Sequence, residues 1–265
     1  GLRLVDMAGR YGGGVRQIEK PWGDVFSLDD LRAGLEQHRP AILALVHAET
    51  STGACQPLAG VADLCREFDC LLLIDSVTSL GGVPLMLDEW GVDLAYSGSQ
   101  KCLSCPPGIA PLTFGPRAAA RLEKRTGPVP NWYLDLSLVS KYWGSERTYH
   151  HTAPINMNYA LREALRLVAE EGLEQRWARH RATAELFWDG LAESGLECHV
   201  PREHRLPSLT TVRVPDGVDA KEVSGRLLSE YNIEIAGGLG ELAGRVWRVG
   251  LMGYNSRREN VERLL

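Results

Sequence analysis

The fold is decided by Val92-Asp93-Leu94-Ala95-Tyr96, a predicted buried strand, and by the polar run Ser97-Gly98-Ser99-Gln100-Lys101 that follows it. A second apolar run, Cys70-Leu71-Leu72-Leu73-Ile74, ends in Asp75, 26 residues before Lys101. The carboxyl ends of neighbouring parallel strands meet at one edge of a sheet. We therefore expect Lys101 and Asp75 to lie over one crevice.

Predicted helices and strands alternate on both sides of this segment. Helical spacing predicts helices over residues 28–38, capped by Ser27 or Asp29, over 58–68, over 157–191 with a break near Gly172, and over 220–231. Apolar or alternating runs predict strands over residues 41–46, 70–74, 92–96, 112–114, 210–214, 233–235 and 245–251, and a loop over 50–53. This order favours an α/β fold with a mostly parallel sheet covered by helices on both faces.

The pattern changes after Gly172, where shorter, alternating strands replace the buried ones. We expect a large domain over residues 1–172 and a smaller C-terminal α+β domain over residues 173–265. The sequence begins without methionine and ends in a helical pattern, so we expect the protein to extend beyond both ends.

The composition is that of a globular protein and argues against several partners. Of the 265 residues 44% are hydrophobic and 24% charged, and the formal net charge is −5. An acidic chain without a basic block is a poor partner for nucleic acid. No apolar stretch approaches the ~20 residues of a membrane-spanning helix. Six cysteines are too few for a disulfide scaffold, and Cys102 and Cys105 lack the further ligands of a metal site, so we expect no metal and a cytoplasmic protein.

An amine and a carboxylate over one crevice suit a pyridoxal 5′-phosphate enzyme. The lysine can hold the cofactor aldehyde as an imine and later act as a base, while the aspartate keeps the ring nitrogen protonated. Taken singly, a lysine after a strand is usually a solvated charge, and Asp-Ser often ends a strand. The joint placement of Lys101 and Asp75 favours the chemical roles.

The wider sequence resembles the class V aminotransferases, which are pyridoxal phosphate enzymes of fold type I. The most similar members are the alanine–glyoxylate and serine–pyruvate aminotransferases. The resemblance covers essentially the whole chain and rests on Asp75-Ser76-Val77 to Gly81-Gly82, Tyr96 to Lys101, Pro106-Pro107-Gly108, Tyr149-His150-His151-Thr152 with Pro154, Arg248 to Gly253, and Glu259-Asn260-Val261.

This resemblance implies roles for individual positions around the cofactor. Lys101 matches the imine-forming lysine, Asp75 the partner of the ring nitrogen, and Val77 a residue that packs on one ring face. Thr50 stands where the family usually has serine, and its hydroxyl could bond the polar edge of the ring. Gln100 matches a phosphate contact.

The resemblance also implies a site shared between two copies of the chain. Tyr149 and Thr152 match residues that reach the phosphate of the neighbouring subunit, so a homodimer is expected. Arg248 matches the arginine that binds the substrate carboxylate, for which a planar guanidinium is well suited; outside the resemblance it would be a surface charge. His150 and His151 are expected to be structural or interfacial, because a lysine already supplies the base.

Family members carry two further cofactor contacts before the position that matches Gly1. These are a glycine-containing phosphate loop at a helix N-terminus and an aromatic residue on the other face of the ring. We therefore expect this chain to be part of a longer enzyme. Some relatives are peroxisomal, so the peroxisome is the alternative to the cytoplasm.

We expect an aminotransferase that moves an amino group from alanine or serine to glyoxylate or another small 2-oxo acid. One alternative is a lyase or desulfurase of the same fold, but a desulfurase needs a cysteine on a mobile loop. Cys198, the one cysteine after the Lys101 region, lies in the predicted strand 196–200. Another alternative is a truncated, non-catalytic module for dimerisation or binding. A dinucleotide-binding fold fits less well, since neither 12–14 nor 237–240 has the Gly-x-Gly-x-x-Gly spacing after a first strand.

Overall fold

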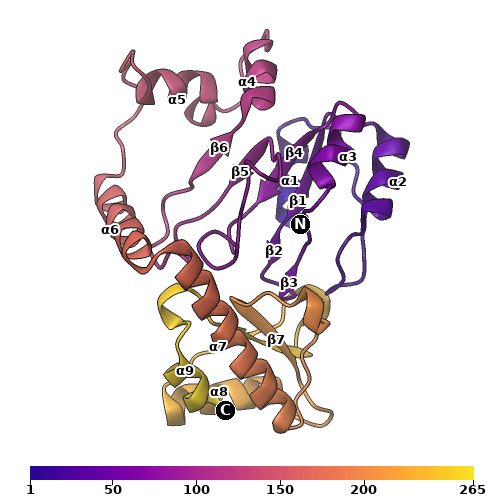
Figure 1. The fold of residues 1–265 in the computed structure, drawn as a ribbon, viewed down its shortest axis with the longest axis vertical. Helices are drawn as coiled ribbons and strands as arrows, with labels where there is room; N and C mark the ends of the chain where they lie inside the picture. Colours follow the sequence, from indigo (N-terminus) through magenta and orange to yellow (C-terminus); the bar gives the residue numbers. More distant parts are fainter.

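The computed structural model describes residues 1–265 and contains a four-stranded and a three-stranded sheet (Figure 1). The first has the order β1 (Ile42–Val46), β4 (Leu71–Asp75), β5 (Leu94–Tyr96) and β6 (Leu112–Phe114). β1, β4 and β5 are parallel and β6 is antiparallel to β5, which confirms the mostly parallel sheet. The register pairs Val46 with Asp75 and Asp75 with Tyr96, so these three strands end at one edge.

Two helices, α2 (Leu28–His38) and α3 (Val61–Glu67), cover one face of this sheet. α2 begins after Ser27, whose hydroxyl accepts a hydrogen bond from the backbone of Asp30 while the Asp30 carboxylate accepts one from the backbone of Ser27. α3 begins later than predicted, because Gly60 has a φ of +78° and interrupts the helix there. The core beneath them joins Leu31, Leu35, Val61, Leu64, Leu72 and Ile74.

The opposite face of the sheet is more open in this chain. Ile42 is 49% exposed, and α1 (Leu2–Arg10) has no buried residue. The buried helical contacts of this sheet therefore lie mainly on one face. α3 connects β1 to β4 on the same side as α2, so both helices protect the same face.

The second sheet is antiparallel, in the order β7 (Leu209–Arg213), β9 (Val246–Gly250) and β8 (Ala236–Gly237). α7 (Leu173–Glu193) packs on it, accompanied by α8 (Ala220–Tyr231) and α9 (Arg258–Leu264). The core of this region joins Ala184, Phe187, Trp188, Leu191, Val212, Trp247, Val249 and Val261. The α+β pattern after Gly172 is present, while the domain boundary itself stays a prediction.

Two strand predictions in this region need correction. The strand expected over 233–235 lies at β8, because Asn232 ends α8 with a φ of +55° and an irregular segment follows it. β7 was expected to be half-exposed, yet its first four residues are buried. Its Thr210 hydroxyl accepts a hydrogen bond from the Trp188 indole at 2.8 Å, so α7 covers a position that the sequence leaves polar.

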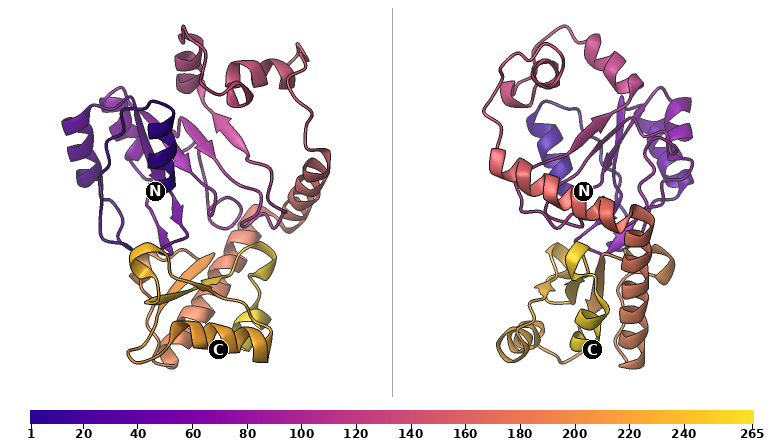
Figure 2. Two further views of the ribbon diagram at one scale, coloured as in Figure 1. Left: turned by 180° about the vertical axis from the view of Figure 1, so that it is seen from behind. Right: turned by 60° about the vertical axis from the view of Figure 1, so that its left-hand side comes forward.

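The two sheets are linked by α4 (Pro116–Glu123), α5 (Leu136–Trp143) and α6 (Ile155–Glu171), which Figure 2 shows running around the first sheet. α6 and α7 meet at Gly172, whose φ of +82° confirms the predicted break.

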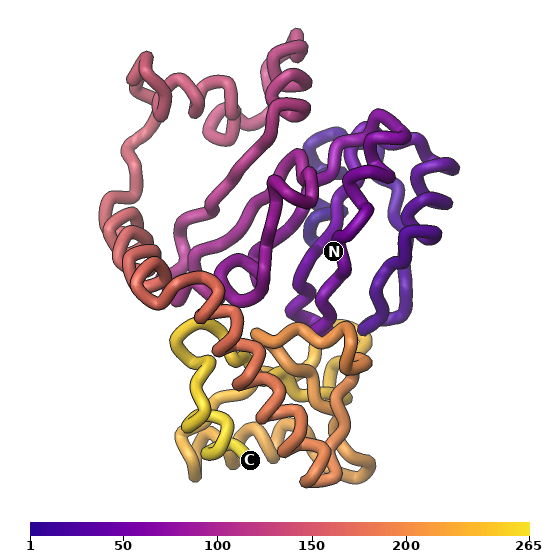
Figure 3. Tube along the Cα trace, in the orientation of Figure 1, coloured from indigo at the N-terminus to yellow at the C-terminus, as the bar shows by residue number.

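A hairpin of β2 (Ala48–Glu49) and β3 (Ala54–Cys55) contacts the second sheet, as the tube in Figure 3 shows. The backbone N–H of Leu206 donates to the Gly53 carbonyl at 2.8 Å there. None of the helices combines the length and the apolar character that crossing a membrane requires.

Candidate functional site

Asp75 ends β4 at the carboxyl edge of the first sheet, and both of its carboxylate oxygens are held. Oδ1 accepts a hydrogen bond from the backbone N–H of Val77 at 2.9 Å, and Oδ2 accepts one from the Tyr96 hydroxyl at 2.6 Å. Burial, and then the Asp75 carboxylate, raise the pKa of Tyr96 well above its usual range, so the phenol stays protonated and donates. The carboxylate therefore has a fixed orientation.

Tyr96 is a site residue that the sequence interpretation missed. In the sequence it is the last residue of a predicted strand, and in the register it pairs with Asp75. Aligning the carboxyl ends of the two predicted strands would have placed the Tyr96 phenol beside the Asp75 carboxylate and so indicated this contact.

The loop that carries Lys101 has a firmly bonded backbone. Ser97 donates through its hydroxyl to the Ser76 carbonyl at 3.0 Å, and Ser99 donates to the Pro106 carbonyl at 2.7 Å. Ser97, Gly98 and Ser99 are all buried, whereas Lys101 is half-buried. The short residues before the lysine thus let the loop pack closely and present the amine at the sheet edge.

Lys101 lines a pocket of about 350 Å³ between the two sheets. Thr50 enters it from the β2–β3 hairpin and Arg248 from β9, so three predicted site residues meet there. The remaining lining residues are Leu209, Glu234, Ile235, Ala236 and Gly250. The pocket therefore joins an amine, a hydroxyl and a guanidinium from three separate parts of the chain.

Arg248 is held on the wall of this pocket by two backbone carbonyls. Its Nε donates to Gly237 at 2.7 Å and its Nη1 to Thr50 at 3.1 Å. Burial lowers the pKa of Arg248, and the negative charge of Glu49 opposes that shift. A guanidinium has five N–H donors, so donors remain for an anionic ligand that would compensate the lost hydration.

Five other predicted site residues do not line this pocket, namely Asp75, Val77, Gln100, Tyr149 and Thr152, so Asp75 shares the sheet edge but not the pocket with Lys101. Gln100 is exposed beside Lys101, and its amide folds back over Gly98, where an added Cβ would lie 2.6 Å from the Gln100 Oε1. Tyr149 is 72% exposed, and its hydroxyl lies 3.1 Å from the Thr152 hydroxyl in the loop between α5 and α6. Within one chain these side chains do not join the Lys101 pocket.

The chemistry of the gathered groups fits pyridoxal 5′-phosphate. Asp75 offers an oriented carboxylate to a ring N–H, and Lys101 offers a primary amine to an aldehyde. No group of three or more His, Cys, Asp or Glu side chains is arranged to hold a metal ion. Cys102 of the Cys-x-x-Cys pair is buried, and its thiol donates to the Thr78 carbonyl at 3.3 Å.

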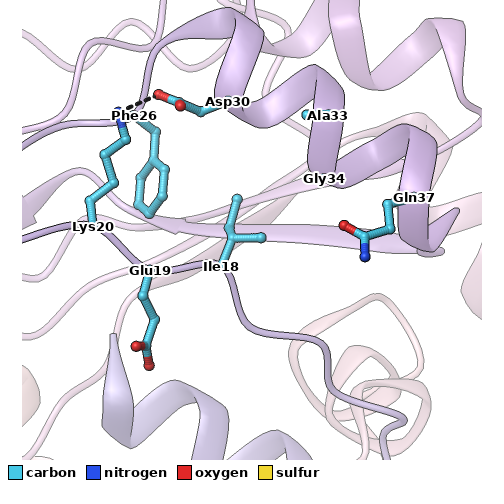
Figure 4. A pocket seen from close by; sticks show the side chains of 8 residues that line it. All are labelled: Ile18, Glu19, Lys20, Phe26, Asp30, Ala33, Gly34 and Gln37. Atoms are coloured by element: carbon cyan, nitrogen blue, oxygen red, sulfur yellow. Dashed lines mark ion pairs between the residues drawn. The ribbon is translucent and has the colours of Figure 1, made fainter.

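A second hollow of about 220 Å³ lies between residues 18–20 and α2 (Figure 4). Its lysine, Lys20, is already paired with Asp30 at 2.6 Å. No strand ends in this hollow. The Lys101 pocket is therefore the candidate site.

Comparisons with known proteins give matches over nearly the whole chain. Residues 3–264 match the family model for aminotransferase class-V. The chain is 44% identical to alanine–glyoxylate aminotransferase of Mus musculus, over 100% of this chain and 65% of that protein. It is 40% identical to (S)-ureidoglycine–glyoxylate transaminase of Bacillus subtilis, over 98% of this chain and 67% of that protein.

The crystal structure of an alanine–glyoxylate aminotransferase from Nostoc sp. superposes with a TM-score of 0.97 at 67% identity. That match covers 99% of this chain and 70% of the other. The chain thus spans about two thirds of the length of the relatives it matches. The matches confirm the resemblance and the fold of type I, and the chain belongs to the aminotransferase class-V family, whose members use pyridoxal 5′-phosphate.

Proposed function

We propose that this chain forms most of an aminotransferase that moves an amino group from alanine or serine to glyoxylate or another small 2-oxo acid. The observation that carries the proposal is the meeting of Lys101, Thr50 and Arg248 in one pocket. Asp75 ends β4 opposite Tyr96, the last residue of the strand that leads into Lys101. The names of the two curated relatives share glyoxylate and differ in the donor. The relatives therefore support the acceptor more directly than the donor.

The residues of the chain would divide the work between cofactor and substrate. The bound cofactor supplies an electron sink that acidifies the substrate α-carbon. Asp75, oriented by Tyr96, would hold the ring N–H and so keep the ring positively charged. Lys101 would hold the cofactor aldehyde and, once displaced, move a proton to or from the α-carbon. Arg248 would bind the carboxylate of donor and acceptor in turn.

Other predicted residues would complete the cofactor contacts. Val77 follows Asp75 and would pack on the ring, while Thr50 would bond its polar edge. Gln100 would turn away from Gly98 to reach the phosphate, a movement open to an exposed side chain.

A homodimer would complete the site. Tyr149 and Thr152 are proposed to reach the phosphate held by a second copy, which agrees with their exposure outside the pocket of their own chain. Exposed aromatic side chains surround them, with Trp132 at 59%, Trp143 at 63% and Tyr159 at 66%. Such a concentration of large apolar groups supports an interface.

The desulfurase alternative is less well supported. Cys198 is half-buried and lies in a single β-bridge to Val212 rather than in the predicted strand. Burial raises the pKa of its thiol, which disfavours the nucleophilic thiolate. All six cysteines are free thiols, which supports the proposed reducing, cytoplasmic compartment.

Lys101→Ala in the whole protein tests the proposal. We expect loss of the visible absorption of bound cofactor and loss of the half-reaction with L-alanine, because no amine remains to hold the aldehyde. Lys221→Ala, an exposed lysine of α8, is the matched control and should change neither. Retention of both signals in Lys101→Ala would refute the assignment of this lysine.

A further inference from the structure

A cluster of three charged side chains lies where α6 meets α7. The two helices meet in a turn at Gly172 (Figure 2), and Glu171 is the last residue of α6 before this turn. Arg176 Nη1 lies 2.6 Å from Glu171 Oε2, and Arg179 donates to both carboxylate oxygens through Nε and Nη2. One carboxylate is thus shared by two guanidinium groups.

Arg176 extends from this cluster to the loop of the candidate base. It is only 5% exposed, and it donates to the carbonyl of Cys102, the residue after Lys101. Its Nε donates to the Gly81 carbonyl at 3.1 Å. The backbone beside Lys101 is therefore fixed by a side chain of α7.

Arg179 extends to the segment that follows the strand of Arg248. Its Nη1 donates to the carbonyls of Gly253 at 2.9 Å and Ser256 at 2.6 Å. The two loops also meet directly, since the backbone N–H of Tyr254 donates to the Ser104 hydroxyl at 2.8 Å. Glu171 is thus the common partner of two arginines of α7, each of which bonds one of the two loops.

We propose that Glu171, Arg176 and Arg179 form a clamp that sets the spacing between the Lys101 amine and the Arg248 guanidinium. This inference rests on the proposed function. An amino acid must present its α-carbon to the Lys101 amine and its carboxylate to the Arg248 guanidinium. Because the distance between its α-carbon and its carboxylate is fixed, the spacing of these two side chains matters. A displacement of about 1 Å between such groups can slow a reaction about 100-fold. The clamp residues are positioning residues, because none of them lines the pocket.

The Glu171 carboxylate stays ionised at neutral pH. Hydrogen bonds from Arg179, and then from Arg176, lower the pKa of Glu171 to about 2, against the effect of burial. Glu171 and Arg179 are 25% and 31% exposed in their side chains, so substitution there removes the ion pair without opening the core.

The kinetic experiment compares Glu171→Gln and Arg179→Gln with wild type in the whole enzyme. Arg166→Gln is the control, because Arg166 pairs with Glu163 and Glu170 on the exposed side of α6. The half-reaction with L-alanine is measured per bound cofactor, with the saturating rate separated from KM. We expect a 10- to 100-fold lower rate per bound cofactor in the clamp variants and less than a twofold change in the control.

An unchanged rate per bound cofactor would overturn the clamp, even if the variants melt earlier, because earlier melting alone marks a purely structural role. Should Glu171→Gln fail to fold, Arg179→Lys keeps the charge, loses the planar fork, and is measured in the same way. An active wild type with unaffected variants contradicts only the clamp. A wild type that does not react with amino acids contradicts the proposed function.

Hydrogen exchange of the cofactor-free protein gives a readout that does not depend on activity. Segments 101–105 and 252–256 contain backbone hydrogen bonds that the clamp should protect together. In Glu171→Gln we expect faster exchange in both segments and unchanged exchange in β1 and β4. Faster exchange in one segment only, or throughout the chain, would contradict the coupling.

Discussion

His180 should make the protein less stable as the pH falls below 6.5. Its side chain is 0% exposed and both ring nitrogens are bonded. Nδ1 lies 2.8 Å from the Arg176 carbonyl, and the backbone N–H of Gly253 donates to Nε2 at 2.9 Å. Nε2 must therefore be the acceptor and Nδ1 must carry the proton. Protonation of Nε2 would break the bond to Gly253.

The size of the effect follows from the two protonation states. Burial lowers the pKa of His180 from 6.5 to about 4, so as the pH falls this histidine is protonated in the unfolded chain before it is protonated in the folded protein. The stabilisation is complete above pH 6.5 and is lost as the pH falls towards 4. At pH 5 the loss is about 2 kcal/mol for one such histidine. Burial also lowers the pKa of His47 to about 4, so the two histidines together should contribute a loss of about 4 kcal/mol between pH 8 and pH 5.

His180→Gln isolates one of these contributions. Glutamine cannot titrate, but its amide oxygen can accept from Gly253 in place of Nε2. Urea unfolding at pH 8 and pH 5 should show a loss about 2 kcal/mol smaller in the variant than in wild type. Equal pH dependence in His180→Gln and wild type would refute the reasoning.

Three further substitutions test other parts of the site. Tyr96→Phe removes the hydrogen-bond donor to Asp75. Because a hydrogen bond to a charged group contributes about 1.5–3 kcal/mol, we expect the half-reaction with L-alanine to slow about tenfold at unchanged cofactor content. An unchanged rate would contradict the orienting role. Arg248→Ala should raise KM for the amino acid about 10- to 100-fold while the cofactor stays bound, and loss of cofactor with an unchanged KM would contradict the carboxylate role. Gly53→Ala should lower the free energy of unfolding by about 1–3 kcal/mol in urea titrations. The φ of Gly53 is +78°, and the new Cβ would lie 2.6 Å from the Thr211 hydroxyl. Unchanged stability would show that the β2–β3 hairpin can shift.

Elements with a strong local pattern could be predicted from the sequence. α8 has the predicted bounds 220–231, because Asp219 caps it and Asn232 ends it in the left-handed region. α2 likewise carries its own capping box at Ser27. The strand ends of Asp75 and Tyr96 followed from apolar runs bounded by polar residues. In each case neighbouring residues determine the local structure, so a sequence pattern is sufficient.

Features that depend on distant partners could not be predicted in this way. Residues 210–214 alternate as in a half-exposed strand, yet Thr210 and Thr211 are both buried by contacts with α7 and with the β2–β3 hairpin. The bond from Tyr96 to Asp75 and the clamp at Glu171 join segments that are 21 and more than 70 residues apart. No local spacing contains that information.

The two sheets contribute different groups to the site, and this division has a consequence for mutations. The proposed partner of the cofactor ring, Asp75, ends a strand of the first sheet, and the proposed partner of the aldehyde, Lys101, follows another, whereas Arg248 lies on the second sheet. Changes within the first sheet should therefore alter cofactor content and absorption. Changes at the junction, such as those at Glu171, should leave the cofactor bound and alter how the substrate is held between the two sheets. A junction variant that loses cofactor as readily as Lys101→Ala would show that the sheets do not act as separate supports.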